Sequence, residues 1–333
     1  MSLRWLRYRM AIAAATFLVF AVVLAQDQKT PPWAYALNPP ATPGAPAAPA
    51  AAPADTSLKH VPGSNVGLTL PQTRDLFNPP DWYPDDHPAM PDVVAHGRRP
   101  DVRACGYCHL PNGQGRPENA SLAGLPAGYI VQQMADYRNG LRKTSESKMG
   151  PPTTMLAIGK AANDAEVKAA AEYFASIKPK PWIKVIEAKM VPKTHVSGWM
   201  FVETEGADKG MEPIGSRVIE MPVDLERTEL RDSKSSFIAY APIGSIKKGE
   251  ALVATGGAGK TIKCSICHGD DLKGLGNVPS ISGRSPSYIA RQLYDIQQGN
   301  RNGPYTQLMK AAVAKLTVDD MVSITAYLAS RNP

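Results

Sequence analysis

The chain has 333 residues, of which 43% are hydrophobic and 20% charged, so it has room for two folded domains and is not disordered as a whole. The formal net charge is +7, but three of its basic residues, Arg4, Arg7 and Arg9, precede an apolar run at the N-terminus. Subtracting them leaves 34 basic against 30 acidic residues, and no motif that reads DNA or RNA is present. We therefore expect no nucleic-acid partner.

Residues 1–25 have the pattern of an export signal. The three arginines are not accompanied by any acidic residue, and residues 11–25 are apolar except for Thr16. A membrane-spanning helix needs about 20 apolar residues, so this shorter run favours a signal peptide cleaved after Ala25. A retained N-terminal anchor is the alternative. In either case we expect a periplasmic protein, tied to the inner membrane if the anchor is kept.

Residues 26–57 are expected to form a linker. Between residues 39 and 53, only Thr42 and Gly44 interrupt a run of alanine and proline. Such a segment buries no core and runs as an extended spacer, which would suit a membrane tether.

All four cysteines lie in two copies of the pattern C-x-x-C-H. In this motif two thiols bind the vinyl groups of one haem, and the histidine ligates its iron. A lone C-x-x-C also suits a redox dithiol or half a zinc site, but two copies with the adjacent histidine indicate two covalently attached haem c groups. The residues concerned are Cys105, Cys108, His109, Cys264, Cys267 and His268.

A longer repeat surrounds the two motifs. An offset of 159 residues pairs Gly115, Gly124, Tyr129, Gln133 and Arg142 with Gly274, Gly283, Tyr288, Gln292 and Arg301. Five extra residues in the first copy then change the offset to 154, which pairs Met155 with Met309 and Tyr173 with Tyr327. The methionine-to-tyrosine interval is 18 residues in both copies.

Each copy is expected to be helical around its haem. A helix that begins at Ser285-Pro286 and ends at Gly299 is predicted in the second copy, with a counterpart in the first. The last helix of each copy begins with a capping box, over residues 163–166 and 317–320.

Each iron needs a sixth ligand, and methionine is expected where electron transfer is the function because it raises the potential. Met309 is the only methionine between His268 and the final helix. In the first copy Met149 and Met155 compete, and the register of the repeat selects Met155. We therefore predict that a histidine and a methionine ligate each iron.

The other histidines, His60, His87, His96 and His195, are expected to be surface or structural residues. Ligation of one iron by two histidines is the minor alternative.

These elements resemble the class I c-type cytochromes with two haem domains, most closely the cytochrome c4 family. The matching features are the two C-x-x-C-H motifs, the Gly124 and Gly283 segments, the tyrosine-bearing helices, the distal methionines and the terminal helices. The resemblance implies an all-α fold of two tandem cytochrome c domains that pack face to face. The first, with an N-terminal extension, covers 58–180, and the second covers 247–333.

Two departures from the family are visible. A proline carbonyl usually orients the haem-binding histidine; Pro279 occupies that position in the second copy, whereas Ala120 stands there in the first. A helix is expected over 244–254 before the second motif, without a clear equivalent before Cys105. We therefore expect the two haems to have unlike environments and different potentials.

Residues 181–246 form an insertion that is long for this family. It is expected to be irregular with some β-structure, because residues 218–221 and 237–240 have strand-like composition. It either wraps the haem domains or provides a docking surface for a partner.

The expected function is transfer of single electrons between respiratory or dehydrogenase partner proteins. Methionines at both irons would leave no open position for a substrate, so we expect no catalysis. The alternative is a cytochrome subunit of a periplasmic dehydrogenase, with the insertion as its docking element.

Overall fold

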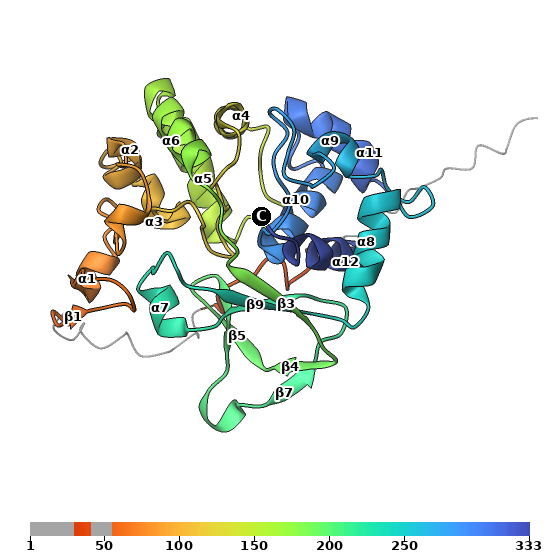
Figure 1. Cartoon of the computed structure of the whole chain (residues 1–333), viewed down its shortest axis with the longest axis horizontal. Helices are drawn as coiled ribbons and strands as arrows, with labels where there is room; N and C mark the ends of the chain where they lie inside the picture. Colours follow the sequence, from red (N-terminus) through yellow and green to blue (C-terminus); the bar gives the residue numbers. More distant parts are fainter. Residues whose placement is uncertain (1–29, 41–54) are drawn as a thin grey trace, which may run out of the picture.

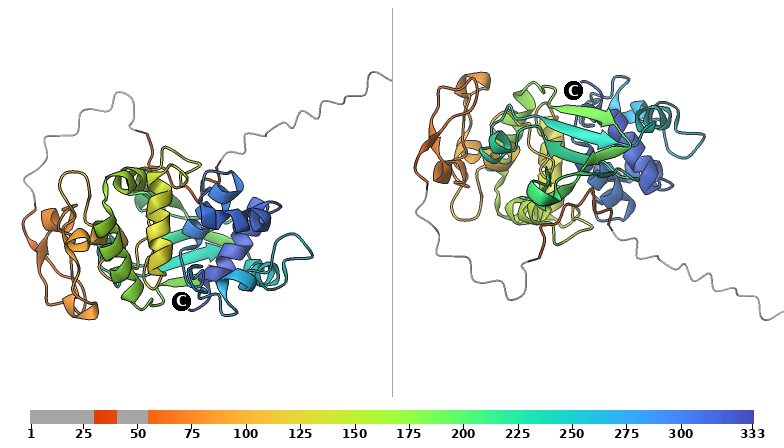
Figure 2. Two further views of the ribbon diagram at one scale, coloured as in Figure 1. Left: turned by 90° about the horizontal axis from the view of Figure 1, so that it is seen from above. Right: turned by 90° about the horizontal axis from the view of Figure 1, so that it is seen from below.

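The structure is a computed structural model that describes residues 30–40 and 55–333 (Figure 1). The expected leader, residues 1–25, lies outside the described residues, as does most of the expected linker. Two helical units, each carrying one C-x-x-C-H motif, stand side by side above a layer of strands (Figures 1 and 2).

Along the chain, the first unit is followed by the strand layer and then by the second unit. The helices of the first unit are α1 (Leu70–Thr73), α2 (Asp92–Ala95), α3 (Cys105–His109), α4 (Ala127–Arg138), α5 (Gly150–Ala161) and α6 (Asp164–Ser176). Those of the second are α8 (Ser245–Thr255), α9 (Ser265–His268), α10 (Pro286–Gln297), α11 (Gln307–Val313) and α12 (Val318–Ala329). The insertion contains β3 (Ile183–Glu187), β4 (Met190–Pro192), β5 (Thr194–Ser197), β6 (Met200–Glu203), β7 (Met211–Pro213), β8 (Ile219–Pro222), α7 (Leu225–Glu229) and β9 (Phe237–Ala241).

The described residues are not all-α as a whole, because the insertion, which was expected to contain some β-structure, forms sheets. The insertion builds a three-stranded sheet in the order β3-β9-β8, in which β3 is parallel and β8 antiparallel to the central strand. Phe237, Ala239 and Ala241 alternate with less buried neighbours along β9, the period of a strand with one buried face. The two strands expected from composition are β8 and β9, and a further short pair, β1 (Leu58–Lys59) and β2 (Leu68–Thr69), precedes the first unit.

The duplication is visible in a pair of equivalent hydrogen bonds. The amide of Gly124 donates to the carbonyl of Phe174 at 3.0 Å, and that of Gly283 donates to Leu328 at 2.9 Å. The two glycines are 159 residues apart and their two acceptors 154, so both offsets of the repeat meet in one pair of contacts.

The predicted helix starts are confirmed. Both terminal helices, α6 and α12, begin with the expected capping boxes, and the hydroxyl of Ser285 accepts from the amide of Tyr288 at the start of α10. The helix expected before the second motif is α8. In the same place before Cys105 the first unit has only the four-residue α2.

Part of the expected linker is packed and not extended. Residues 33–36 are buried, and the Tyr35 hydroxyl donates to Asp295 Oδ1 at 2.6 Å. Arg291 donates to the Ala34 carbonyl at 2.7 Å. Trp33 and Tyr35 both join the core of the second unit, because each removes a large apolar surface from water there.

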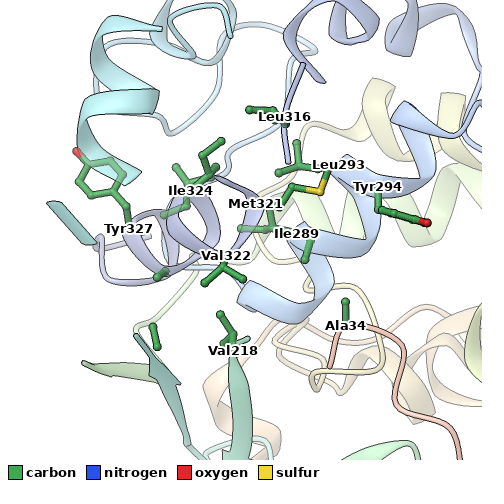
Figure 3. Packing of buried hydrophobic residues seen from close by; sticks show 14 of the residues in the cluster. Ala34, Val218, Ile289, Leu293, Tyr294, Leu316, Met321, Val322, Ile324 and Tyr327 are labelled. Carbon is green, nitrogen blue, oxygen red and sulfur yellow. The ribbon is translucent and has the colours of Figure 1, made fainter. Parts of the chain in front are cut away.

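The core of the second unit lies between α10 and α12, where Ile289 and Leu293 face Met321 and Ile324 (Figure 3). Helix α8 crosses α12 closely at Gly249. A Cβ atom on this glycine would lie 2.0 Å from the carbonyl oxygen of Ser323. The crossing therefore depends on the absence of a side chain.

We expect Gly249→Ala to lower the midpoint of thermal unfolding, because the added methyl group must separate α8 from α12. Overpacking of this kind costs about 1–3 kcal/mol. Lys247→Ala, at an exposed position of the same helix, is the control and should change stability by less than about 0.5 kcal/mol. Equal midpoints for the two variants, measured by circular dichroism, would contradict the packing argument.

Candidate haem centres

The first motif borders a cavity of about 420 Å³. Cys105, Cys108 and His109 line it from α3, and Met155 lines it from α5. Its remaining walls are mostly apolar and include Val93, Leu125, Tyr129, Ile130, Met134, Ile158, Val167, Ala170 and Phe174. The described structure thus brings the four predicted haem-binding residues of the first centre to one cavity.

The histidine of each motif is held by a backbone carbonyl. His109 Nδ1 lies 2.8 Å from the carbonyl oxygen of Ala120, and His268 Nδ1 lies 2.8 Å from that of Pro279. Because a carbonyl only accepts, Nδ1 carries the proton and Nε2 is left free to bind iron. Burial lowers the pKa of both histidines, which favours the neutral form that a metal requires.

The expected contrast between Ala120 and Pro279 is therefore absent from this hydrogen bond. The acceptor is a main-chain atom that alanine supplies as well as proline does. A difference between the two candidate centres would therefore arise elsewhere.

The two candidate methionines of the first copy lie in different places. Met155 packs against the core of the first unit, as Cys105 does, and lines the cavity. Met149 is fully buried within the core of the second unit and is absent from the cavity wall. The placement favours Met155 as the ligand, in agreement with the register of the repeat.

Predicted haem-binding residues of the second centre lie at the core of the second unit. His268 ends α9 and is buried, while Cys264 and Met309 both pack against the core of the second unit. The predicted ligands of the second iron thus come together around one core, with Met309 supplied by α11.

The remaining histidines lie away from the first cavity wall. His60 is exposed and close to the carbonyl of Val66, and His87 contacts Asp81 and the Tyr173 hydroxyl. The structure therefore gives no support to ligation of the first iron by two histidines.

The first thiol of each motif lies in surroundings that disfavour its ionised form. Burial raises the pKa of the Cys105 thiol to about 12 and that of Cys264 to about 11. A redox dithiol needs a reactive thiolate with a lowered pKa, so the surroundings disfavour that interpretation of C-x-x-C.

The repeated arginines and tyrosines meet across the two units. Arg142 donates to the Tyr288 hydroxyl at 3.0 Å, and Arg301 donates to the Tyr129 hydroxyl at 2.8 Å. The backbones of the two arginines also form an antiparallel bridge. Each copy thus supplies the partner of the other, which the sequence repeat alone did not reveal.

The repeated glutamines complete this interface. The side-chain oxygen of Gln133 accepts from Arg142 at 3.0 Å and from Arg301 at 2.9 Å. That of Gln292 accepts from the same two arginines at 3.1 and 3.2 Å. The six residues form one network with approximate two-fold symmetry between the candidate centres.

This interface has the charge that a haem would need. Arg142 is buried, lines the first cavity and makes no ion pair among the described residues. Within the same described part, Arg301 Nε is buried without a hydrogen-bond partner. Buried guanidinium groups without a carboxylate are unfavourable, and the propionates of a haem would supply the missing negative charge. The residues present therefore fit the group.

Comparisons with known proteins find similarity to c-type cytochromes. No protein-family model matches the chain. The chain is 30% identical over 141 residues to cytochrome c4 of Stutzerimonas stutzeri, which covers 38% of this chain and 64% of that protein. It is 32% identical over 79 residues to cytochrome c-554(548) of Halomonas halodenitrificans, which covers 23% of this chain and 95% of that protein. The chain belongs to the c-type cytochromes and is cytochrome c4-like.

A longer match is to a protein named thiosulfate dehydrogenase electron acceptor from Thiomonas intermedia (strain K12). The identity is 25% over 235 residues, covering 70% of this cytochrome and 80% of that protein. Over residues 30–40 and 55–333, no helix of this cytochrome is long and apolar enough to cross a membrane.

The arginine network predicts energetic coupling between the units. Arg301→Gln leaves the Tyr129 hydroxyl without its donor, and we expect it to lower the free energy of unfolding by about 1–3 kcal/mol. Combined with Arg142→Gln, the loss should be non-additive by at least about 0.5 kcal/mol, because both arginines share the same acceptors. Arg138→Gln, at an exposed ion pair, is the control. Additive losses in denaturant titrations would show that the network is not cooperative.

The placement of the methionines predicts opposite effects of two substitutions. Met155→Ala should abolish the first haem's share of the far-red methionine-to-iron charge-transfer band in the oxidised protein. Met149→Ala should keep this band but lower stability by about 2–5 kcal/mol, because it opens a cavity in the second core. If Met149→Ala removes the band and Met155→Ala does not, the assignment is wrong.

Proposed function

We propose that this protein is an exported dihaem cytochrome that carries single electrons between redox partner proteins and catalyses no reaction itself. The observation that carries the proposal is the duplicated arrangement of a C-x-x-C-H motif, a carbonyl-held histidine and a methionine in register. One haem c would be attached through Cys105 and Cys108, the other through Cys264 and Cys267.

In each centre the bound haem supplies one-electron chemistry at its iron, and the protein sets its surroundings. The carbonyls of Ala120 and Pro279 hold the histidine rings through Nδ1, so Nε2 would be the nitrogen that binds the iron. Met155 and Met309 would close the sixth position, so neither iron would have a free site for substrate. The apolar walls exclude water, which lessens the reorganisation that accompanies a change of charge. These are the requirements of electron transfer and not of catalysis.

The proposed haem domains are residues 58–180 and 247–333, with 181–246 between them. The basic and apolar leader supports export to the periplasm. Sequencing the mature N-terminus distinguishes its two forms: a protein that begins at Gln26 has lost a signal peptide, whereas one that keeps residues 1–25 has an anchor.

A second candidate function is that of a cytochrome subunit of a dehydrogenase. It is supported by two relatives named thiosulfate dehydrogenase electron acceptor, from Thiomonas intermedia (strain K12) and Stutzerimonas stutzeri (strain A1501). Purification from its native cells tests the point. A dehydrogenase that remains in constant stoichiometry through several steps would favour a subunit, and a protein isolated alone would favour a free carrier.

The doubled motif predicts the mass of the mature protein. Mass spectrometry of the intact, denatured chain should show two covalent haem additions, since thioether bonds survive unfolding. Replacing both cysteines of either motif by serine should remove one addition and leave the other, so each double variant controls for the other. A wild-type protein with one haem or none would overturn the proposal.

A further inference from the structure

The insertion forms hydrogen bonds with the first motif and with the turn that follows it. Asn112 and Gln114, in the turn that follows His109, donate to the carbonyls of Ser233 and Ser235 at 2.6 and 2.7 Å. Arg231 of the insertion donates to the carbonyl of Tyr107 at 2.8 Å. Residues 231–235 therefore lie directly against the first C-x-x-C-H motif.

Arg231 covers the residue between the two cysteines. Its guanidinium group lies 3.6 Å from the centre of the Tyr107 ring, in a cation–π contact. Tyr107 is 8% exposed, whereas the repeat equivalent in the second motif, Ile266, is 65% exposed. One motif is thus closed by the insertion and the other is open.

The backbone of Arg231 is held in an unusual conformation. Its φ angle is +58°, in the left-handed region that a residue with a side chain seldom adopts. Such strain persists only where the surroundings fix the residue, and it is often found at functional positions. The contacts with Tyr107 show what this conformation achieves: they place a cation against the motif.

The charges around the two motifs also differ. Arg103, Arg116, Glu118 and Arg231 all line the first cavity. Arg116 is paired with Glu118, while Arg231 makes no ion pair among the described residues, so its positive charge is uncompensated.

The second motif lacks these charges. The repeat places Ile262, Leu275 and Asn277 where the first copy has Arg103, Arg116 and Glu118. Ile262 is 41% and Leu275 64% exposed, so these two positions beside the second motif are open and uncharged.

Both differences act on redox potential in the same direction. Oxidation adds a positive charge to the iron, and a nearby fixed cation makes that addition less favourable. A cover that excludes water removes solvent that would stabilise the oxidised form. The centre with Arg231 should therefore hold its electron more firmly.

We propose that Arg231 is a positioning residue that seals the first motif and holds the first haem at the higher of the two potentials. The inference rests on the proposed function, since it requires two haems. Electrons that enter the molecule would then settle on the first haem. The insertion would thus give two similar centres different redox potentials.

A potentiometric titration of the holoprotein, followed by absorbance, tests this order. Two one-electron waves are expected, and Met309→His identifies the second haem by moving its wave. The wave that Met309→His leaves in place belongs to the first haem. In the unmutated protein this wave must lie at the higher potential. If the first haem lies lower, the inference is wrong, whether or not any Arg231 variant folds.

Arg231 variants then test the cause. Arg231→Gln should lower the reduced-to-oxidised ratio of the first haem about tenfold at a fixed potential, which is about 59 mV for a one-electron couple. Arg231→Lys keeps the charge and should restore most of this ratio. Arg217→Gln, elsewhere in the insertion and paired with Glu212, is the matched control and should move neither wave.

The outcomes separate the two proposals. A protein without two haems refutes the proposed function itself. The titration can instead show two one-electron waves, with the wave of the first haem unmoved by Arg231→Gln or only that of the second haem moved. Either result refutes the role of Arg231 and leaves the proposed function intact.

Discussion

The turn that follows each C-x-x-C-H motif is the constraint on which the rest of each unit depends. The amide of Gly115 donates to the carbonyl of His109, and that of Gly274 donates to His268, at 2.9 and 2.8 Å. Both glycines have positive φ angles. A Cβ atom on Gly115 would lie 2.6 Å from the carbonyl oxygen of Ala120, so no side chain fits.

That same carbonyl is the one that accepts from His109 Nδ1. A single backbone turn therefore determines which nitrogen of the imidazole is free and where it points. The surrounding helices pack around this fixed ring: Phe174 of α6 contacts His109 edge to face, with ring centres 6.0 Å apart. The helices thus fix the turn that follows the motif, and this turn fixes the orientation of the His109 ring.

Features that depend on near neighbours in the chain were predictable from the sequence. The capping boxes and the helix start at Ser285 are such local patterns, and the structure contains them. The expected effect of Ala120 was wrong because the side-chain type says nothing about a contact made by a main-chain oxygen. The packing of Trp33 and Tyr35 was missed because alanine and proline dominate the segment that follows them. Contacts between the copies, such as that of Arg142 with Tyr288, could not be predicted from the repeat. The repeat shows which residues occupy equivalent positions in the two copies, but it does not show which residues touch.

Symmetry explains why the insertion matters for the properties of this cytochrome. The two histidines have equivalent hydrogen bonds, and the arginine network joins the two units through equivalent contacts. Contributions of this kind to the two potentials largely cancel when their difference is taken. A preferred direction of transfer would therefore come from residues that differ between the two copies or occur in only one of them. Among the described residues, Arg231 and the segment around it meet that condition at the first motif, because the insertion occurs once in a chain whose haem units occur twice.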